Sequence, residues 1–274
     1  MTTTTPDTAT REWGIEAVDV DAYLDRIDHL RLPPSPAALR SMMAAHIRAI
    51  PFENVDVLIG HPGISLAAIT AKLVGRRRGG YCYEHALLFA AVLERLGYTV
   101  ERRMARVQPG GSGLHTHMLL VAHAGGEPHL VDIGFGAGMM YPMPLRDGAV
   151  VDQAGWEHRL DRVGPLWTLS KRTADGDWEV LHEHDEAPQR PADYEVAHHY
   201  VSTHPRSPFT GQLVVMRLEP GVSKRLVGGE LTVEYADGRV ERTPVPVEDI
   251  DRTLRQLDVE LEPAELAALL TRLS

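Results

Sequence analysis

The sequence predicts an α+β protein, because helical patterns fill its first third and strand patterns take over from about residue 98. Apolar residues recur at helical spacing in the first part. Short alternating runs, separated by Gly-Gly and Asp-Gly pairs, dominate the second part. Helices followed by a block of strands argue against alternating βαβ units.

Capping signals mark where the early helices begin and end. Ser35 supplies an N-cap and Pro36 a first-turn proline, and Pro51 stops the helix that they start. Gly97 favours the left-handed conformation at the end of an apolar helix. The predicted helices of this part span residues 19–30, 36–50, 65–74 and 84–96.

Alternation with a period of two predicts the strands. Gly125-Gly126, Asp175-Gly176 and Asp237-Gly238 each join two such runs and predict hairpins. Two helical segments, 248–257 and 263–273, close the chain. The predicted strands span residues 98–107, 115–123, 129–135, 166–172, 178–184, 211–219, 229–235 and 239–245.

The composition limits the function classes. The 274 residues are 43% apolar and carry a formal net charge of −10, which disfavours general binding to nucleic acid or to an anionic membrane. A single cysteine excludes an intrachain disulfide and fits a reducing cytosol. The start has no secretory pattern and no apolar run reaches the ~18 residues of a membrane span. We therefore expect a cytoplasmic protein. The sequence leaves open whether it is a monomer or a homodimer.

The only cysteine, Cys82, stands at a position suited to a nucleophile. Gly79-Gly80 permits a tight turn, and Cys82 then falls at the start of an apolar helix, where the helix dipole favours a thiolate. Glu84 opposes this effect unless one of the arginines at 76–78 pairs with it. The alternative is that Cys82 is a small buried hydrophobic residue.

A catalytic cysteine needs a histidine and a residue that orients it. If a two- or four-residue loop is centred on Gly125-Gly126, His117 and Asp132 lie on one face as diagonal neighbours. A three- or five-residue loop puts them on opposite faces. In the first arrangement Asp132 holds one ring nitrogen of His117, and the other accepts the Cys82 proton. The alternative is a structural histidine and a turn aspartate.

Two histidine-rich runs raise the alternative of a metal site. His115 and His117 alternate along a predicted strand, and His182 and His184 do so within the run HEHDE. No glutamate follows the first pair at close spacing, and the second run is typical of a polar strand end or loop. We therefore expect no metal.

Several blocks together resemble the arylamine N-acetyltransferase family. They cover roughly residues 50–210 in the family's order and form a specific signal as a set. The blocks are Ile50-Pro51-Phe52-Glu53-Asn54, Arg78-Gly79-Gly80-Tyr81-Cys82-Tyr83-Glu84, Thr116-His117 followed by MLLV, Leu130-Val131-Asp132-Ile133-Gly134-Phe135-Gly136, and Ser202-Thr203-His204-Pro205 followed by Ser207 and Phe209.

The resemblance implies a triad of Cys82, His117 and Asp132. It implies ping-pong transfer of acetyl from acetyl-CoA, a co-substrate and not a bound cofactor, to an arylamine, arylhydrazine or N-hydroxyarylamine. The alternative is a related amide synthase that releases a polyketide or other long acyl chain onto an aromatic amine. The implied fold is a helical bundle (1–99), an antiparallel β-barrel (100–208) and an α/β lid (209–274) with a cysteine-protease-like core.

The resemblance also assigns roles around the triad. A loop with Gly134 and Gly136 lets the pantetheine of CoA approach the backbone, and Glu53 and Arg78 match a supporting ion pair. The family usually has Asn where this chain has Ala86, which removes a polar group close to the nucleophile. Three aromatic positions match residues that line the acceptor pocket, and Thr116 matches a position beside the catalytic histidine. We expect four residues to bind the substrate. They are Phe52, Tyr83, Thr116 and Phe135.

Overall fold

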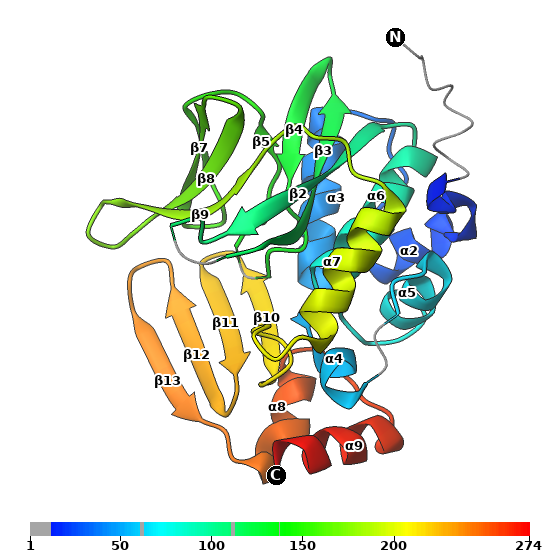
Figure 1. Ribbon diagram of the computed structural model, residues 1–274, viewed down its shortest axis with the longest axis vertical. Helices are drawn as coiled ribbons and strands as arrows, with labels where there is room; N and C mark the ends of the chain where they lie inside the picture. The colour runs from blue at the N-terminus through cyan, green and yellow to red at the C-terminus, as the bar shows by residue number, and fades with distance from the viewer. Residues whose placement is uncertain (1–11, 61–62, 111–112, 137) are drawn as a thin grey trace.

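The computed structural model describes residues 12–60, 63–110, 113–136 and 138–274. Within these ranges, helices come first, an eight-stranded sheet follows, and a five-stranded sheet with two helices ends the chain (Figure 1). The α+β prediction is confirmed. The early helices are η1 (Ile15–Ala17), α2 (Val20–Arg26), α3 (Pro36–Ala49), α4 (Val55–Ile59), α5 (Leu66–Leu73) and α6 (Cys82–Arg95).

Local sequence sets the limits of these helices. Ser35 Oγ accepts the backbone N–H of Ala38 at 3.1 Å, so the predicted cap of α3 forms. Helix α2 ends at Arg26 and not at residue 30, because the chain turns at Asp28, whose φ is +52°. None of the helices in the described ranges is long and apolar enough to cross a lipid bilayer.

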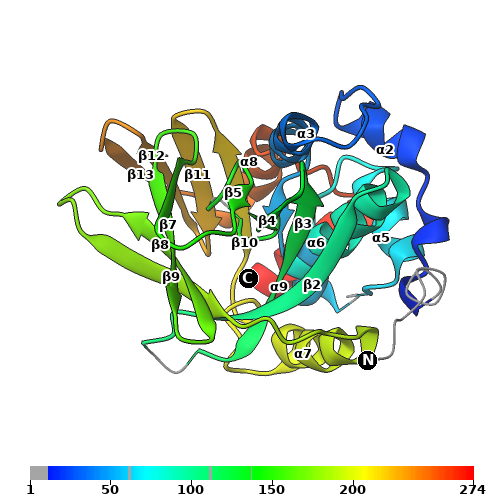
Figure 2. The same cartoon turned by 90° about the horizontal axis from the view of Figure 1, so that it is seen from above.

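The eight-stranded antiparallel sheet curls into an almost closed barrel. Its order is β5-β4-β3-β2-β9-β8-β7-β6, and the edge strands β5 and β6 contact each other. Figure 2 shows helices α2, α3, α5 and α6 on one side of β2 and β3, with β7 to β9 on the other. The strands are β2 (Thr99–Val107), β3 (His115–Ala124), β4 (Glu127–Val131), β5 (Met143–Pro144), β6 (Ala149–Asp152), β7 (Glu157–Val163), β8 (Leu166–Arg172) and β9 (Trp178–His184).

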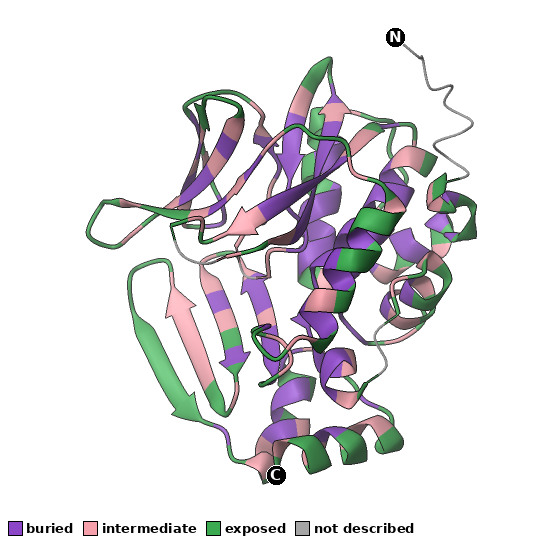
Figure 3. Ribbon diagram, in the orientation of Figure 1, coloured by how far each residue is buried: buried purple, intermediate pink, exposed green. Residues whose placement is uncertain are grey.

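The five-stranded sheet joins a short early strand to four strands from the last quarter of the chain. Its order is β1-β10-β11-β12-β13, so the short strand β1 (Phe52–Glu53) lies far in sequence from its partner β10. Helix α4 shares an apolar core with this sheet and the last helices. Edge strand β13 is exposed (Figure 3). The remaining elements are α7 (Pro191–Thr203), β10 (Val214–Glu219), β11 (Val222–Val227), β12 (Glu230–Tyr235), β13 (Val240–Pro244), η2 (Val247–Asp249), α8 (Ile250–Gln256) and α9 (Pro263–Leu273).

Helix α6 connects the helical layer to the barrel. Its residues 82–93 are all buried, and it packs against β2 and β3. Ala86 lies on this helix and is fully buried. The three-part division at residues 99 and 208 stays a prediction. Strand β1 and helix α4 belong to the first part by sequence but pack with the C-terminal sheet. Helix α7 packs against β3, within the second part.

Candidate active site

Cys82 is the first residue of α6 and is 5% exposed. The turn before it has no room for side chains, because a Cβ on Gly79 would lie 1.9 Å from the carbonyl oxygen of Pro51. His85 Nε2 lies 2.9 Å from the Gly80 oxygen and 3.2 Å from the Pro51 oxygen, and so bridges both sides of the turn. The two glycines therefore serve close backbone packing, which fixes the start of the helix.

A buried chain of side chains holds His85 in turn. Because Nε2 of His85 faces carbonyl oxygens, it carries the proton, and Nδ1 accepts from His46 Nε2 at 2.7 Å. His46 Nδ1 then accepts from the hydroxyl of Tyr23 at 2.7 Å. Burial lowers the pKa of both imidazoles, to about 4 for His85, so both stay neutral. Helices α2 and α3 are thereby tied to the turn before Cys82.

The hairpin of β3 and β4 brings the predicted histidine and aspartate together. Ala124 pairs with Glu127, which leaves the two-residue loop Gly125-Gly126 and confirms the predicted register as far as the Leu120–Val131 pair. Strand β4 ends at Val131 and not at residue 135, so Asp132 directly follows the paired segment. His117 Nε2 donates to Asp132 Oδ1 over 2.8 Å, and Cys82 lies close enough to His117 to help raise the pKa of the imidazole. Since Nε2 faces the carboxylate, Nδ1 is the nitrogen that remains for the thiol.

Opposite forces act on the charges of this group. Burial alone would lower the pKa of His117, but the Asp132 carboxylate and, to a smaller extent, Cys82 outweigh it and raise the pKa to about 10. Burial would also raise the pKa of Asp132, yet His117 and His182 hold it well below its usual value. The buried group therefore favours an imidazolium paired with a carboxylate.

The contact between His182 and Asp132 was not predicted from the sequence. Its Nε2 lies 2.9 Å from Asp132 Oδ2, while His117 binds the other oxygen of the same carboxylate. Ligand atoms of the three side chains lie within 4.8 Å of one another, a spacing that a metal ion also accepts. Each imidazole already donates to the carboxylate, so hydrogen bonds account for the arrangement. The alternation of His182 and His184 was visible in the sequence, but not which strand lies beside them.

A cavity of about 760 Å³ opens beside the thiol, between the barrel, α7 and the five-stranded sheet. Tyr83 is absent from its described lining and instead supports the wall, since its hydroxyl donates to the Thr116 oxygen over 2.5 Å. Gly136 also lies outside the lining, with a φ of +72° and Met216 against it. The predicted residues that do line it are Phe52, Cys82, Thr116, His117, Gly134 and Phe135.

Replacement of Gly134 by alanine is expected to lower kcat/KM about 100-fold, because the nucleophile must move. A Cβ at this position would lie 2.7 Å from Cys82 Cα and 2.8 Å from its carbonyl oxygen. Gly211→Ala is the matched control, since a Cβ there meets nothing within 4 Å. Steady-state kinetics give kcat/KM for both variants and the wild type. Equal values for Gly134→Ala and the wild type would contradict the close contact between residue 134 and Cys82.

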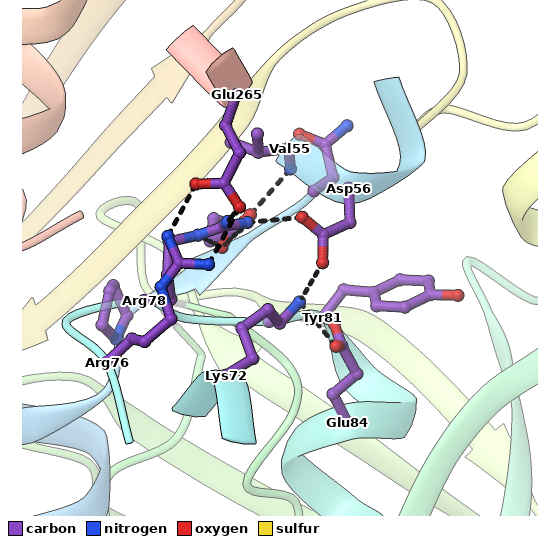
Figure 4. A network of polar contacts seen from close by, with 12 residues as sticks. Val55, Asp56, Lys72, Arg76, Arg78, Tyr81, Glu84 and Glu265 are labelled. Carbon is purple, nitrogen blue, oxygen red and sulfur yellow. Dashed lines mark hydrogen bonds and ion pairs between the residues drawn. The ribbon is translucent and has the colours of Figure 1, made fainter. Parts of the chain in front are cut away.

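A buried charge network anchors the turn on its other side (Figure 4). Arg78 is fully buried and pairs with Glu53 at 2.8 Å, Asp56 at 2.6 Å and Glu265 at 3.0 Å. The predicted pair of Glu53 and Arg78 is confirmed. The ionic partner of Glu84 is not one of the arginines at 76–78 but Lys72, at 2.6 Å, because α5 packs beside α6.

Glu84 caps the nucleophile helix within this network. Its carboxylate accepts the backbone N–H of Tyr81 at 3.2 Å. Burial raises the pKa of Glu84 to about 7, and Lys72 opposes this shift. Burial would lower the pKa of Lys72, but Glu84, Glu53 and Asp56 outweigh it and raise it. The ammonium therefore offsets the negative charge that Glu84 brings close to Cys82.

Replacement of Arg78 by methionine is expected to lower the free energy of unfolding by about 3–5 kcal/mol, because Glu53 stays buried without its partner. Arg77→Met is the matched control. Arg77 is 68% exposed and meets Glu260 at 3.3 Å, so its loss should cost at most about 0.5 kcal/mol. Urea unfolding of both variants measures the difference, and equal stabilities would refute the anchoring role of Arg78.

A thiol at a helix start, beside a histidine and an aspartate carried by a barrel, is the arrangement of an enzyme that works through a covalent bond to sulfur. The chain belongs to the N-acetyltransferase family, whose family model matches residues 36–266. It is an acyltransferase, as predicted.

Known proteins support this membership. An arylamine N-acetyltransferase of Mycolicibacterium smegmatis is 39% identical over 79% of this chain and 82% of its own length. A solved structure of Mycobacterium marinum arylamine N-acetyltransferase in complex with CoA is 33% identical, with a TM-score of 0.85 and coverage of 93% and 98% of the two chains. An N-malonyltransferase of Gibberella moniliformis is 30% identical over 71% of this chain and 67% of its own length.

Proposed function

We propose that the protein transfers an acetyl group from acetyl-CoA to an aromatic amine, hydrazine or N-hydroxyarylamine through a thioester on Cys82. The observation that carries this proposal is the placement of Cys82 and His117 together at the wall of a large cavity, with His117 hydrogen-bonded to Asp132. The names of the relatives support the substrates, and the CoA complex of the Mycobacterium marinum enzyme supports the donor. The lone thiol fits a cytoplasmic location.

The reaction has two half-reactions that share one thiol. In the first, the Cys82 proton already lies on His117 Nδ1 as part of the imidazolium, the thiolate attacks the acetyl carbonyl carbon, and the C–S bond to CoA breaks. The CoA thiolate takes the proton from the imidazolium and leaves. In the second, the amine nitrogen attacks the thioester carbon while His117 takes the amine proton and returns it to the sulfur. Asp132 stabilises the imidazolium in both steps.

The cavity supplies places for the partners of this reaction. Phe52 and Phe135 offer aromatic surface beside the thiol, and the Phe135 ring meets the His117 ring edge-on at 5.2 Å. Thr116 and Gly134 complete the wall next to Cys82. We assign these four residues to the acceptor and to the acyl end of CoA. Tyr83 and Gly136 support that wall without lining it.

Release of free CoA tests the proposal. Acetyl-CoA is mixed with a panel of arylamines, hydrazines and N-hydroxyarylamines, and a parallel series contains malonyl-CoA, because one relative is an N-malonyltransferase. Acceptor-dependent release with acetyl-CoA supports the proposal. Release with malonyl-CoA alone would replace the donor, and no release with either, despite a thiol that alkylates rapidly, would point to a longer acyl chain.

A further inference from the structure

His182 holds the aspartate of the triad from strand β9, which carries none of the three predicted residues. Its Nε2 lies 2.9 Å from Asp132 Oδ2, while His117 Nε2 lies 2.8 Å from Oδ1. His182 and Asp132 are both fully buried. Each carboxylate oxygen is therefore held by a different imidazole.

The partners of His182 fix where its proton lies. A carboxylate only accepts hydrogen bonds, so Nε2 carries the proton. Nδ1 is buried and has no hydrogen-bond partner among the described residues, which fits an unprotonated nitrogen. Burial lowers the pKa of His182, and the hydrogen bond to Asp132 opposes this without reversing it. The ring is thus a neutral donor at neutral pH.

We propose that His182 is a positioning residue, whose neutral imidazole orients Asp132 toward His117 without competing for the proton. This inference rests on the proposed role of the triad. The His182 ring must be neutral for this role. A charged His182 would repel the His117 imidazolium and compete with it for the negative charge of Asp132. The side chain is absent from the described cavity lining, so it acts through Asp132 and not on the substrate.

The neighbours of His182 provide a matched control. His184 lies on the same face of β9, is equally buried, and has no hydrogen-bond partner for either ring nitrogen among the described residues. Its ring centroid lies 5.8 Å from that of His182. Loss of His184 thus removes a buried ring but no bond to Asp132. The titratable groups around His182 are His117, Asp132, His158 and His184.

Three variants separate positioning from packing. His182→Leu removes the donor, His182→Gln keeps a side-chain N–H of similar reach, and His184→Leu removes only the neighbouring ring. We expect His182→Leu to lose about 10-fold to 100-fold in kcat with little change in KM, because Oδ2 of Asp132 is left unsatisfied. His182→Gln should recover most of this loss, and His184→Leu should stay within about 3-fold of wild type.

The pH profile of Cys82 alkylation by iodoacetamide gives a readout that packing alone does not move. Loss of a donor raises the pKa of Asp132, so the acid limb of the profile should move to higher pH in His182→Leu. In His182→Gln the acid limb of the alkylation profile should lie at the wild-type pH again. In His184→Leu it should not move from the wild-type pH. An unmoved limb in His182→Leu, or an equal shift in His184→Leu, would overturn the proposal.

Nitrogen NMR of the wild-type protein labelled at histidine tests the same bond without any substrate. A neutral His182 with its proton on Nε2 is expected throughout neutral pH. A doubly protonated ring, or a proton on Nδ1, would overturn the proposal even in an active enzyme. If the wild type transfers no acetyl group but shows the expected tautomer, the proposed function fails while the bond to Asp132 stands.

Discussion

Cys82→Ala is expected to lose acetyl transfer by at least about four orders of magnitude, because in the proposed mechanism the Cys82 sulfur carries the acetyl group. Cys82 is the only cysteine of the sequence. The alanine keeps the first turn of α6 and removes only the sulfur, so the fold and the cavity remain. Amide product formation from acetyl-CoA and an arylamine, followed against the uncatalysed reaction, measures the loss.

The control for this variant is its thermal unfolding together with its affinity for CoA. Both should stay close to the wild-type values, since Cys82 makes its main contribution in the covalent step. Transfer by Cys82→Ala at even a tenth of the wild-type rate would mean that the amine attacks acetyl-CoA directly. The ping-pong mechanism would then be wrong although the family membership stands.

Asp132→Asn is expected to lower kcat about 10³-fold to 10⁴-fold, as loss of the carboxylate does in other triads. The physical reason lies in the donors around it. His117 and His182 both donate to the carboxylate, but an amide offers one oxygen and one NH₂ group. At least one imidazole then faces a donor. When the NH₂ group faces His117, this ring carries its proton on Nδ1, where it cannot accept the proton of Cys82.

The pH dependence of this variant follows from the same charges. In the wild type the pKa of His117 is raised to about 10, so the imidazolium persists until the pH approaches that value. Without the carboxylate the pKa should fall to ~6.5 or below, and the imidazolium is lost as pH rises through it. Alkylation of Cys82 against pH measures the change. Asp152→Asn, an exposed barrel position, serves as the control and should match the wild type.

The hairpin that joins His117 and Asp132 was predictable because its determinants are local. The glycines at 125 and 126 allow a two-residue turn, and alternation then fixes which side chains share a face. Leu120 accordingly pairs with Val131, as the predicted register requires. The start of α6 was equally local, since the Gly-Gly turn and the apolar run mark it.

Other parts of the site depend on contacts between distant segments. His182 meets Asp132 because β9 pairs with β2, which places His182 opposite Val107. Lys72 meets Glu84 because two helices pack together. Neither contact can be predicted from the residues that are close to it in the sequence. The elements α7, β7 and β11 were missed for a related reason, since weak amphipathicity or frequent charged residues hide their buried faces.

The most direct test of the central claim is the mass of the protein after mixing with acetyl-CoA in the absence of an acceptor. We predict the addition of one acetyl group, located on Cys82 by peptide analysis and released by an arylamine or by hydroxylamine. His117→Phe should form this adduct far more slowly. An active enzyme that never carries an acetyl group, or carries it on a residue other than Cys82, would contradict the account.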